Sequence, residues 1–172
     1  MVATGGPEAG MAYFAPAAEI REMVALAWAM EEGSRRFYQG AGERLQSDPE
    51  AAELFRQLVQ AEEGHKRSLL AGYEHLAGRP AEPASLVPEM GEAGSGDTME
   101  GGTPVREALA WLEGRELTDV LDLAMGLEIN AYDLYIKMAR RVDEESRPIF
   151  AGLAREEQQH LERLGQLLDR RL

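Results

Sequence analysis

Two short segments of the sequence each carry a glutamate three residues before a histidine. They are Glu62 with His65 and Glu157 with His160. On a helix, residues three positions apart share a face about one turn apart, so each pair can present a carboxylate and an imidazole to one metal ion. Because the chain has no cysteine, any metal must be bound through oxygen and imidazole nitrogen. Iron or manganese suits such ligands and zinc also accepts them, so the spacing predicts a metal site without choosing the metal.

These pairs belong to an internal repeat. The segment 55–65, FRQLVQAEEGH, matches 150–160, FAGLAREEQQH, and the segment 26–38, LAWAMEEGSRRFY, matches 123–135, LAMGLEINAYDLY. The offset is 95 residues in the first match and 97 in the second. The chain is therefore a duplicated helix-loop-helix whose second loop is two residues shorter than the first.

The repeat aligns two further glutamates, Glu31 and Glu128, each followed seven residues later by a tyrosine, Tyr38 and Tyr135. Both glutamates fall on helix faces predicted to be buried, where an unpaired carboxylate costs on the order of several kcal/mol, so a cation must accompany them. The tyrosines lie about two turns further along the same face. They could hydrogen-bond the carboxylates or lie beside a redox centre as catalytic residues, and packing in the core explains them equally well.

Together these residues match the ligand set of ferritin-like di-iron bundles, which take one glutamate from each of two helices and Glu-x-x-His from each of the other two. The predicted metal ligands are Glu31, Glu62, His65, Glu128, Glu157 and His160. The alternative is that these side chains form exposed salt bridges on solvated helix faces, which are common in a chain with 28% charged residues.

Four long helices are expected to position the ligands. Apolar residues recur at three- and four-residue steps, with Ser34 as the only polar exception on the first stripe, and cap-like residues such as Asp48 and Thr118 begin helices. The predicted ranges are 17–45, 49–76, 118–142 and 146–172. The fold class expected is all-α: a ferritin-like four-helix bundle made of two repeated hairpins.

The remaining segments are rich in glycine and proline. Residues 1–16 are expected to form an N-terminal arm or the remnant of a linker, and residues 17–172 are expected to form one ferritin-like domain. Within it, residues 78–117 are expected to cross between the two hairpins and to contain a short helix from Pro104 to about Glu113.

Charge and composition exclude several classes of function. The net charge of −13 leaves no basic surface for nucleic acid or for an anionic membrane. The longest apolar run, Met23 to Met30, is far shorter than the roughly 20 residues of a membrane span. The absence of cysteine and of a signal-peptide pattern fits a cytoplasmic location.

At these residues the chain resembles the rubrerythrins, whose ligand helices show a glutamate followed seven residues on by tyrosine, as in EEGSRRFY and EINAYDLY, and Glu-x-x-His. The resemblance covers roughly residues 17 to 170. The segments GGPEAGMAYF, DTMEGG and RELTDVLDLAMGLE look most like the rubrerythrin-type domain fused behind a rhodanese module. This resemblance implies two iron ions, bridged by Glu62 and Glu157, and an upstream sulfurtransferase domain in a longer native protein.

The chain departs from that family's pattern in two ways. Typical rubrerythrins carry an extra glutamate three residues after the third-helix ligand, where this sequence has Ala131, so the site is expected to be symmetric. Many also carry a rubredoxin domain with four cysteines, and this chain has none. Any reductant must therefore come from an external electron donor.

The expected function is that of a non-haem di-iron oxidoreductase that reduces hydrogen peroxide or dioxygen, working as a homodimer. One alternative is a non-enzymatic iron-binding or iron-sensing module attached to a sulfurtransferase. A ferroxidase or iron-storage role is less favoured, because storage ferritins generally lack a second Glu-x-x-His.

Overall fold

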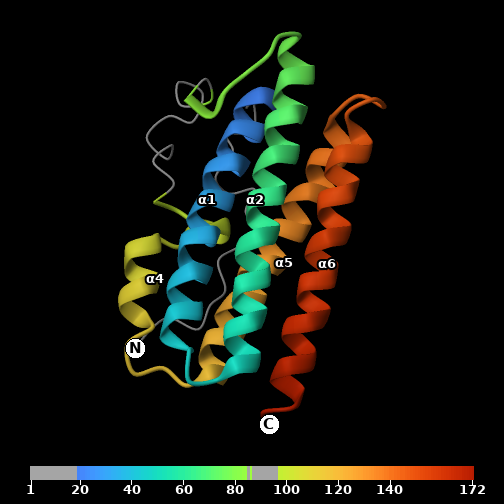
Figure 1. Cartoon of the computed structure of the whole chain (residues 1–172). Helices are drawn as coiled ribbons and strands as arrows, with labels where there is room; N and C mark the ends of the chain where they lie inside the picture. The colour runs from blue at the N-terminus through green and yellow to red at the C-terminus, as the bar shows by residue number, and fades with distance from the viewer. Residues whose placement is uncertain (1–18, 85, 87–96) are drawn as a thin grey trace.

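Four long helices run side by side in the computed structural model of the chain (Figure 1). The structure describes residues 19–84, 86 and 97–172. The long helices are α1 (Ile20–Arg44), α2 (Pro49–Ala77), α5 (Leu117–Arg141) and α6 (Arg147–Asp169). In these described parts, β-type pairing is limited to an isolated bridge between Thr98 and Pro104. The prediction of an all-α, ferritin-like bundle is confirmed.

The two halves of the repeat form two hairpins, α1 with α2 and α5 with α6, and these pack against each other within one chain (Figure 1). The chain crosses between the hairpins through a 3₁₀ turn, η3 (Glu100–Gly102), and a short helix, α4 (Val105–Trp111), that packs on α1. The short helix predicted in the crossover is thus present. The expected arm, residues 1–16, and part of the crossover, residues 87–96, lie outside the described residues.

Local sequence signals set the ends of α2. The Asp48 side chain accepts a hydrogen bond from the backbone N–H of Ala51 at 3.1 Å, and Pro49 occupies the first helical position. The helix ends at Gly78, whose φ of 64° is the left-handed conformation that glycine adopts without steric cost. The predicted start of this helix is confirmed.

The predicted cap of α5 was wrong. Glu116 is the capping residue, with extended backbone, and Thr118 lies inside the first turn. Leu117 is partly buried against the apolar cluster around Phe37. Because burying that leucine stabilises the helix more than a threonine cap would, the cap lies two residues earlier than the sequence signal indicates.

The core is divided into two apolar clusters, one toward each end of the bundle. One includes Met30, Leu69 and Ala154, and the other includes Phe37 and Leu58. On each long helix, the stretch between the two clusters carries buried polar side chains. We call this stretch the polar layer; its members are Glu31, Ser34, Glu62, His65, Glu128, Glu157 and His160, together with Glu100 from η3.

No helix among the described residues combines the length and the apolar composition that crossing a membrane requires. This agrees with the short apolar runs seen in the sequence.

A single glycine sets how closely the crossover approaches α1. A Cβ added at Gly33 would lie 2.5 Å from the backbone oxygen of Thr98 and 3.2 Å from Cγ2 of Val105. We predict that Gly33→Ala lowers the free energy of unfolding by about 1–3 kcal/mol, because the backbone of the crossover must move. Gly126→Ala is the control, since its Cβ would meet no atom within 4 Å, and we expect it to be neutral or to stabilise by up to about 1 kcal/mol. Urea unfolding measures both, and equal effects would contradict the assigned contact.

Candidate metal centre

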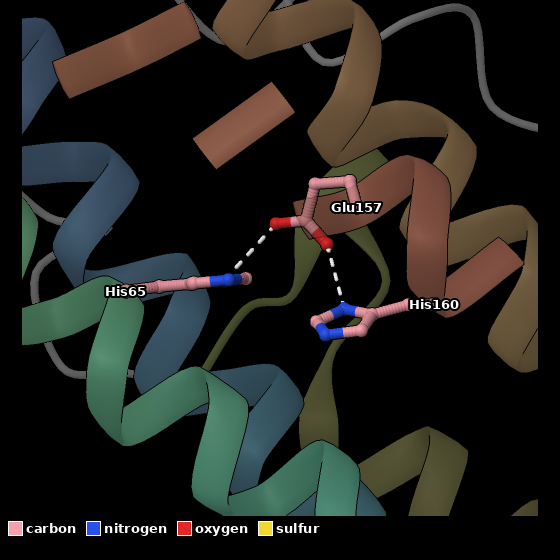
Figure 2. A group of neighbouring side chains, drawn as sticks. All are labelled: His65, Glu157 and His160. Atoms are coloured by element: carbon pink, nitrogen blue, oxygen red, sulfur yellow. Dashed lines mark hydrogen bonds and ion pairs between the residues drawn. The ribbon is translucent and has the colours of Figure 1, made fainter. Parts of the chain in front are cut away.

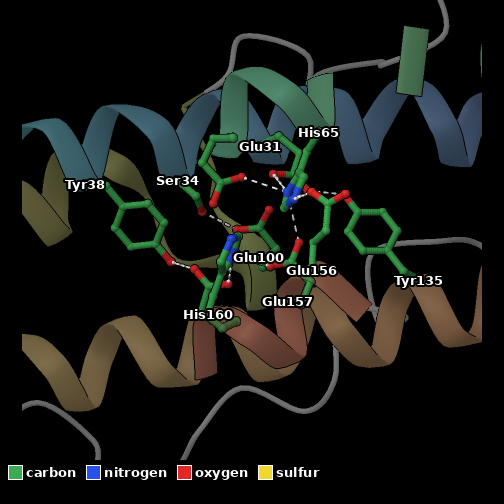
Figure 3. A network of polar contacts seen from close by, with 11 residues as sticks. Glu31, Ser34, Tyr38, His65, Glu100, Tyr135, Glu156, Glu157 and His160 are labelled. Atoms are coloured by element: carbon green, nitrogen blue, oxygen red, sulfur yellow. Dashed lines mark hydrogen bonds and ion pairs between the residues drawn. The ribbon is translucent and has the colours of Figure 1, made fainter. Parts of the chain in front are cut away.

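The six predicted ligands converge at the middle of the bundle, and each is at most 5% exposed. Each of the four long helices contributes to the set: α1 and α5 one glutamate each, α2 and α6 one Glu-x-x-His pair each. Figure 3 shows several of these side chains pointing into the space between the helices. Their burial excludes the alternative in which they form exposed salt bridges.

Three overlapping groups of these residues have ligand atoms that all lie within 4.8 Å of one another. The groups are Glu31, Glu62 and His65; Glu62, Glu128 and His160; and His65, Glu157 and His160. Glu62 is shared by the first two groups, and Glu157 joins the two histidines. Two cations placed in the first and second groups would share Glu62.

Glu157 lies between the two imidazoles (Figure 2). One of its oxygens is 3.1 Å from Nδ1 of His65 and the other is 3.1 Å from Nδ1 of His160. The two rings are stacked with centroids 5.4 Å apart. A carboxylate that faces both imidazoles in this way has the geometry of a bridging ligand.

Two poorly satisfied carboxylate oxygens indicate that the polar layer can accommodate cations. Glu62 Oε2 and Glu157 Oε1 are buried, and although Nδ1 of His65 lies 3.4 and 3.1 Å from them, neither oxygen accepts a well-aligned hydrogen bond from a described residue. Leaving a charged oxygen buried without a partner is costly, and cations in this space would supply the missing partners. The oxygen and imidazole donors present therefore fit two metal ions.

When no metal is bound, protons compensate the negative charges of the buried carboxylates in the polar layer. Burial, together with the charge of Glu157, raises the pKa of Glu128 to about 8. Burial opposes charging of His160, but its hydrogen bonds with Glu128 and Glu157 raise its pKa to about 9. Burial and the neighbouring Glu31 likewise raise the pKa of Glu62 well above its ordinary value. Since metal ligands must be deprotonated, metal binding here displaces protons.

The two tyrosines donate hydrogen bonds across the two hairpins. The Tyr38 hydroxyl on α1 donates to Glu128 Oε1 on α5 at 2.5 Å, and the Tyr135 hydroxyl on α5 donates to Glu31 Oε1 on α1. Both tyrosines also pack in the apolar clusters, so the geometry agrees with two of the roles that the sequence left open, hydrogen bonding to the predicted ligands and packing in the core. Each bond fixes one carboxylate oxygen, and the other faces a histidine at the centre: Glu31 Oε2 is 3.3 Å from Nδ1 of His65, and Glu128 Oε2 is 3.0 Å from Nδ1 of His160.

Sequence reasoning missed Glu156, which lies next to Glu157 on α6. Its carboxylate is 3.1 Å from Nε2 of His65, although its side chain is 56% exposed. A carboxylate at Nε2 favours the proton on that nitrogen and leaves the Nδ1 lone pair free for a metal. The equivalent position in the first half is Ala61, so the repeat comparison could not reveal this contact.

Sequence reasoning also missed Glu100, a fifth buried carboxylate in the polar layer. Ser34 on α1 donates a hydrogen bond to its Oε2. Ser34 was the one signal available, as the polar exception on an apolar stripe. The surroundings of the six ligands are therefore not symmetric: in the repeat the position of Ser34 corresponds to Ala131, which offers no hydroxyl group.

Comparison with known proteins agrees with this geometry. The sequence model of the rubrerythrin family matches residues 15–88 and 106–171, which together make up most of the chain and contain all six predicted ligands. No curated protein sequence matches the chain.

Removing one tyrosine hydroxyl tests the hydrogen bonds across the hairpins. We predict that Tyr135→Phe lowers the free energy of unfolding of the metal-free protein by about 1–3 kcal/mol, because it removes a donor from a buried carboxylate. Tyr132→Phe, on the same helix but 36% exposed, should change it by less than about 0.5 kcal/mol. Urea unfolding followed by circular dichroism gives both values. If both variants lost the same free energy of unfolding, the buried Tyr135 hydroxyl would contribute no more than the exposed one.

Proposed function

We propose that this chain, which belongs to the rubrerythrin family, binds two iron ions in its polar layer and reduces hydrogen peroxide or dioxygen. The observation that carries the proposal is the convergence of two Glu-x-x-His pairs and two further glutamates, all buried, into three overlapping ligand groups. Carboxylate and imidazole ligands without thiolate suit non-haem iron. The family makes iron the first metal to test, with manganese and zinc as the rivals.

The positions of the side chains suggest a role for each. Glu31 and Glu128 would be terminal ligands, because each belongs to one group only and has one oxygen held by a tyrosine. Glu62 and Glu157 would bridge, since the first is shared between groups and the second contacts both imidazoles. Each of the two histidines, His65 and His160, would bind one ion through its imidazole.

Two iron ions, when bound, supply one electron each, which together match the two-electron reduction of one small oxidant molecule. Reduction of hydrogen peroxide to two water molecules consumes two electrons and two protons. Reduction of dioxygen to hydrogen peroxide consumes the same number of each. The chain has no cysteine to hold an iron–sulfur or rubredoxin-type centre, so an external donor must return the electrons.

The protein itself orients the ligands and limits access. The Tyr38 and Tyr135 hydroxyls hold Glu128 and Glu31 in place, and Glu156 holds the ring of His65. Because the ligands are buried between two apolar clusters, bulk water is excluded. A diatomic or similarly small oxidant fits such a site better than an organic substrate does.

Metal content and reaction with oxidant test the proposal directly. After anaerobic loading with Fe(II), we expect elemental analysis to give about two irons per chain, following the ligand set of di-iron bundles. Stopped-flow absorbance should then show both irons oxidised within seconds of adding hydrogen peroxide. Two irons that react only sluggishly would favour iron binding or sensing, and a large cage on size exclusion would favour storage. Less than one metal per chain would refute the metal site itself.

Single substitutions test the assigned ligands. We predict that Glu62→Ala and Glu157→Ala each abolish binding of the second iron while the helical content stays nearly unchanged, because each removes a carboxylate shared by both ions. Glu63→Ala is the control, since that neighbouring side chain is 45% exposed and faces Arg35 and Lys66. Elemental analysis and circular dichroism provide the readouts. Two irons retained in both ligand variants would overturn the assignment.

A further inference from the structure

We propose that Glu100 is a seventh metal ligand, delivered by the crossover to the ion beside Glu31, and that Ser34 holds its carboxylate when no metal is bound. The inference rests on the proposed two-metal function and extends it. The six ligands predicted from the repeat come from the four long helices, whereas Glu100 comes from the connection between the hairpins.

The crossover forms a closed turn that presents Glu100 to the polar layer. The N–H of Val105 donates to the carbonyl of Asp97 at 2.8 Å, and the N–H of Met99 donates to the carbonyl of Thr103 at 2.9 Å. Gly101, directly after Glu100, has a φ of 76°, the left-handed region that favours glycine. These bonds fix the backbone on both sides of Glu100.

Two packing contacts hold this turn against the bundle. Met99 is fully buried in the apolar cluster around Phe37. On the other side, Gly33 on α1 leaves room for the backbone of Thr98, which a larger residue would displace. The turn is thereby fixed next to Ser34, which follows Glu31 by one turn of α1.

The carboxylate of Glu100 is buried without a cation. It is 3% exposed and accepts a hydrogen bond from Ser34, and within the described parts of the chain it forms no ion pair with a lysine, arginine or histidine. Burial and the charges of Glu31 and Glu157 raise the pKa of this carboxyl well above its ordinary value, so the ionised form that a metal requires is unfavourable here without a cation. A single hydroxyl donor does not compensate a charge buried beside other carboxylates, whereas a metal ion at the same centre does.

Its position also assigns Glu100 to one of the two ions. Figure 3 shows its side chain among those of the polar layer, and the Ser34 that holds it lies on the helix that carries Glu31. Glu31 belongs to the group with Glu62 and His65, and Glu100 is outside this group in the metal-free chain, so binding requires its carboxylate to leave Ser34 and turn toward Glu31. The family match leaves residues 89–105 uncovered and so does not include Glu100.

The test is to compare Co(II) binding to the wild-type chain, Glu100→Gln and the control Glu107→Gln under anaerobic conditions. Glu107 is an exposed glutamate of the same crossover, so its variant makes the same change in charge away from the centre. Competition with a chromophoric chelator gives the two affinities. The visible absorption of Co(II) reports the number of ligands around each ion, which is independent of catalytic activity.

We expect Glu100→Gln to weaken one of the two Co(II) sites by at least about 10-fold, the scale at which even indirect partners of a metal affect affinity, and to change the absorption of that ion alone. Glu107→Gln should match the wild type. Affinities and spectra of Glu100→Gln equal to those of the wild type would overturn the inference and leave the two-metal function standing. Failure of the wild-type chain to bind two ions would refute the proposed function instead.

If Glu100→Gln does not fold, Ser34→Ala provides a second, independent test of the inference. Without the serine hydroxyl, the side-chain hydrogen bond that competes with the metal for Glu100 is lost, so one Co(II) ion should bind more tightly than in the wild type. Unchanged or weaker binding would mean that Glu100 and Ser34 form a structural pair only.

Discussion

The structure depends on burying five carboxylates at the centre of a four-helix bundle. Glu31, Glu62, Glu100, Glu128 and Glu157 are each at most 3% exposed, and burial of uncompensated charge opposes folding. Apolar clusters on both sides of the polar layer provide the stabilisation that keeps the helices together despite this cost. The imidazoles and tyrosine hydroxyls satisfy some of the oxygens, and the two left without a well-aligned hydrogen bond belong to ligand groups that could hold cations.

Duplication explains how one short chain surrounds such a centre. Each hairpin supplies a glutamate, a tyrosine and a Glu-x-x-His pair, and the tyrosine of each hairpin bonds the glutamate of the other. Neither hairpin can complete its own hydrogen bonds, so the two must pack together. This mutual dependence ties the pairing of the hairpins to the geometry of the predicted ligands.

Most of this arrangement could be predicted because it is periodic. The six predicted ligands recur at a nearly constant offset, and signals such as Asp48–Pro49 fix helix ends locally. Glu100 could not be found in the same way, because it has no counterpart in the repeat and lies in a glycine-rich connection. Its placement depends on a close approach between Gly33 and Thr98, a contact between distant parts of the chain that no local pattern encodes. The start of α5 was missed because burial of Leu117 outweighs the cap signal of Thr118.

Two features of the polar layer have no counterpart in the repeat, the Glu156 contact and the Ser34–Glu100 pair, and both lie on the same side of the centre. Glu156 contacts His65, while Ser34 and Glu100 lie beside Glu31, and His65 and Glu31 belong to one ligand group. Their counterparts in the repeat, Ala61 and Ala131, bring no such partner to the group of Glu128 and His160. Additional negative charge and a more basic imidazole both stabilise the higher oxidation state of a metal. If two iron ions bind as proposed, these residues would therefore lower the reduction potential of the ion held beside Glu31 relative to the other.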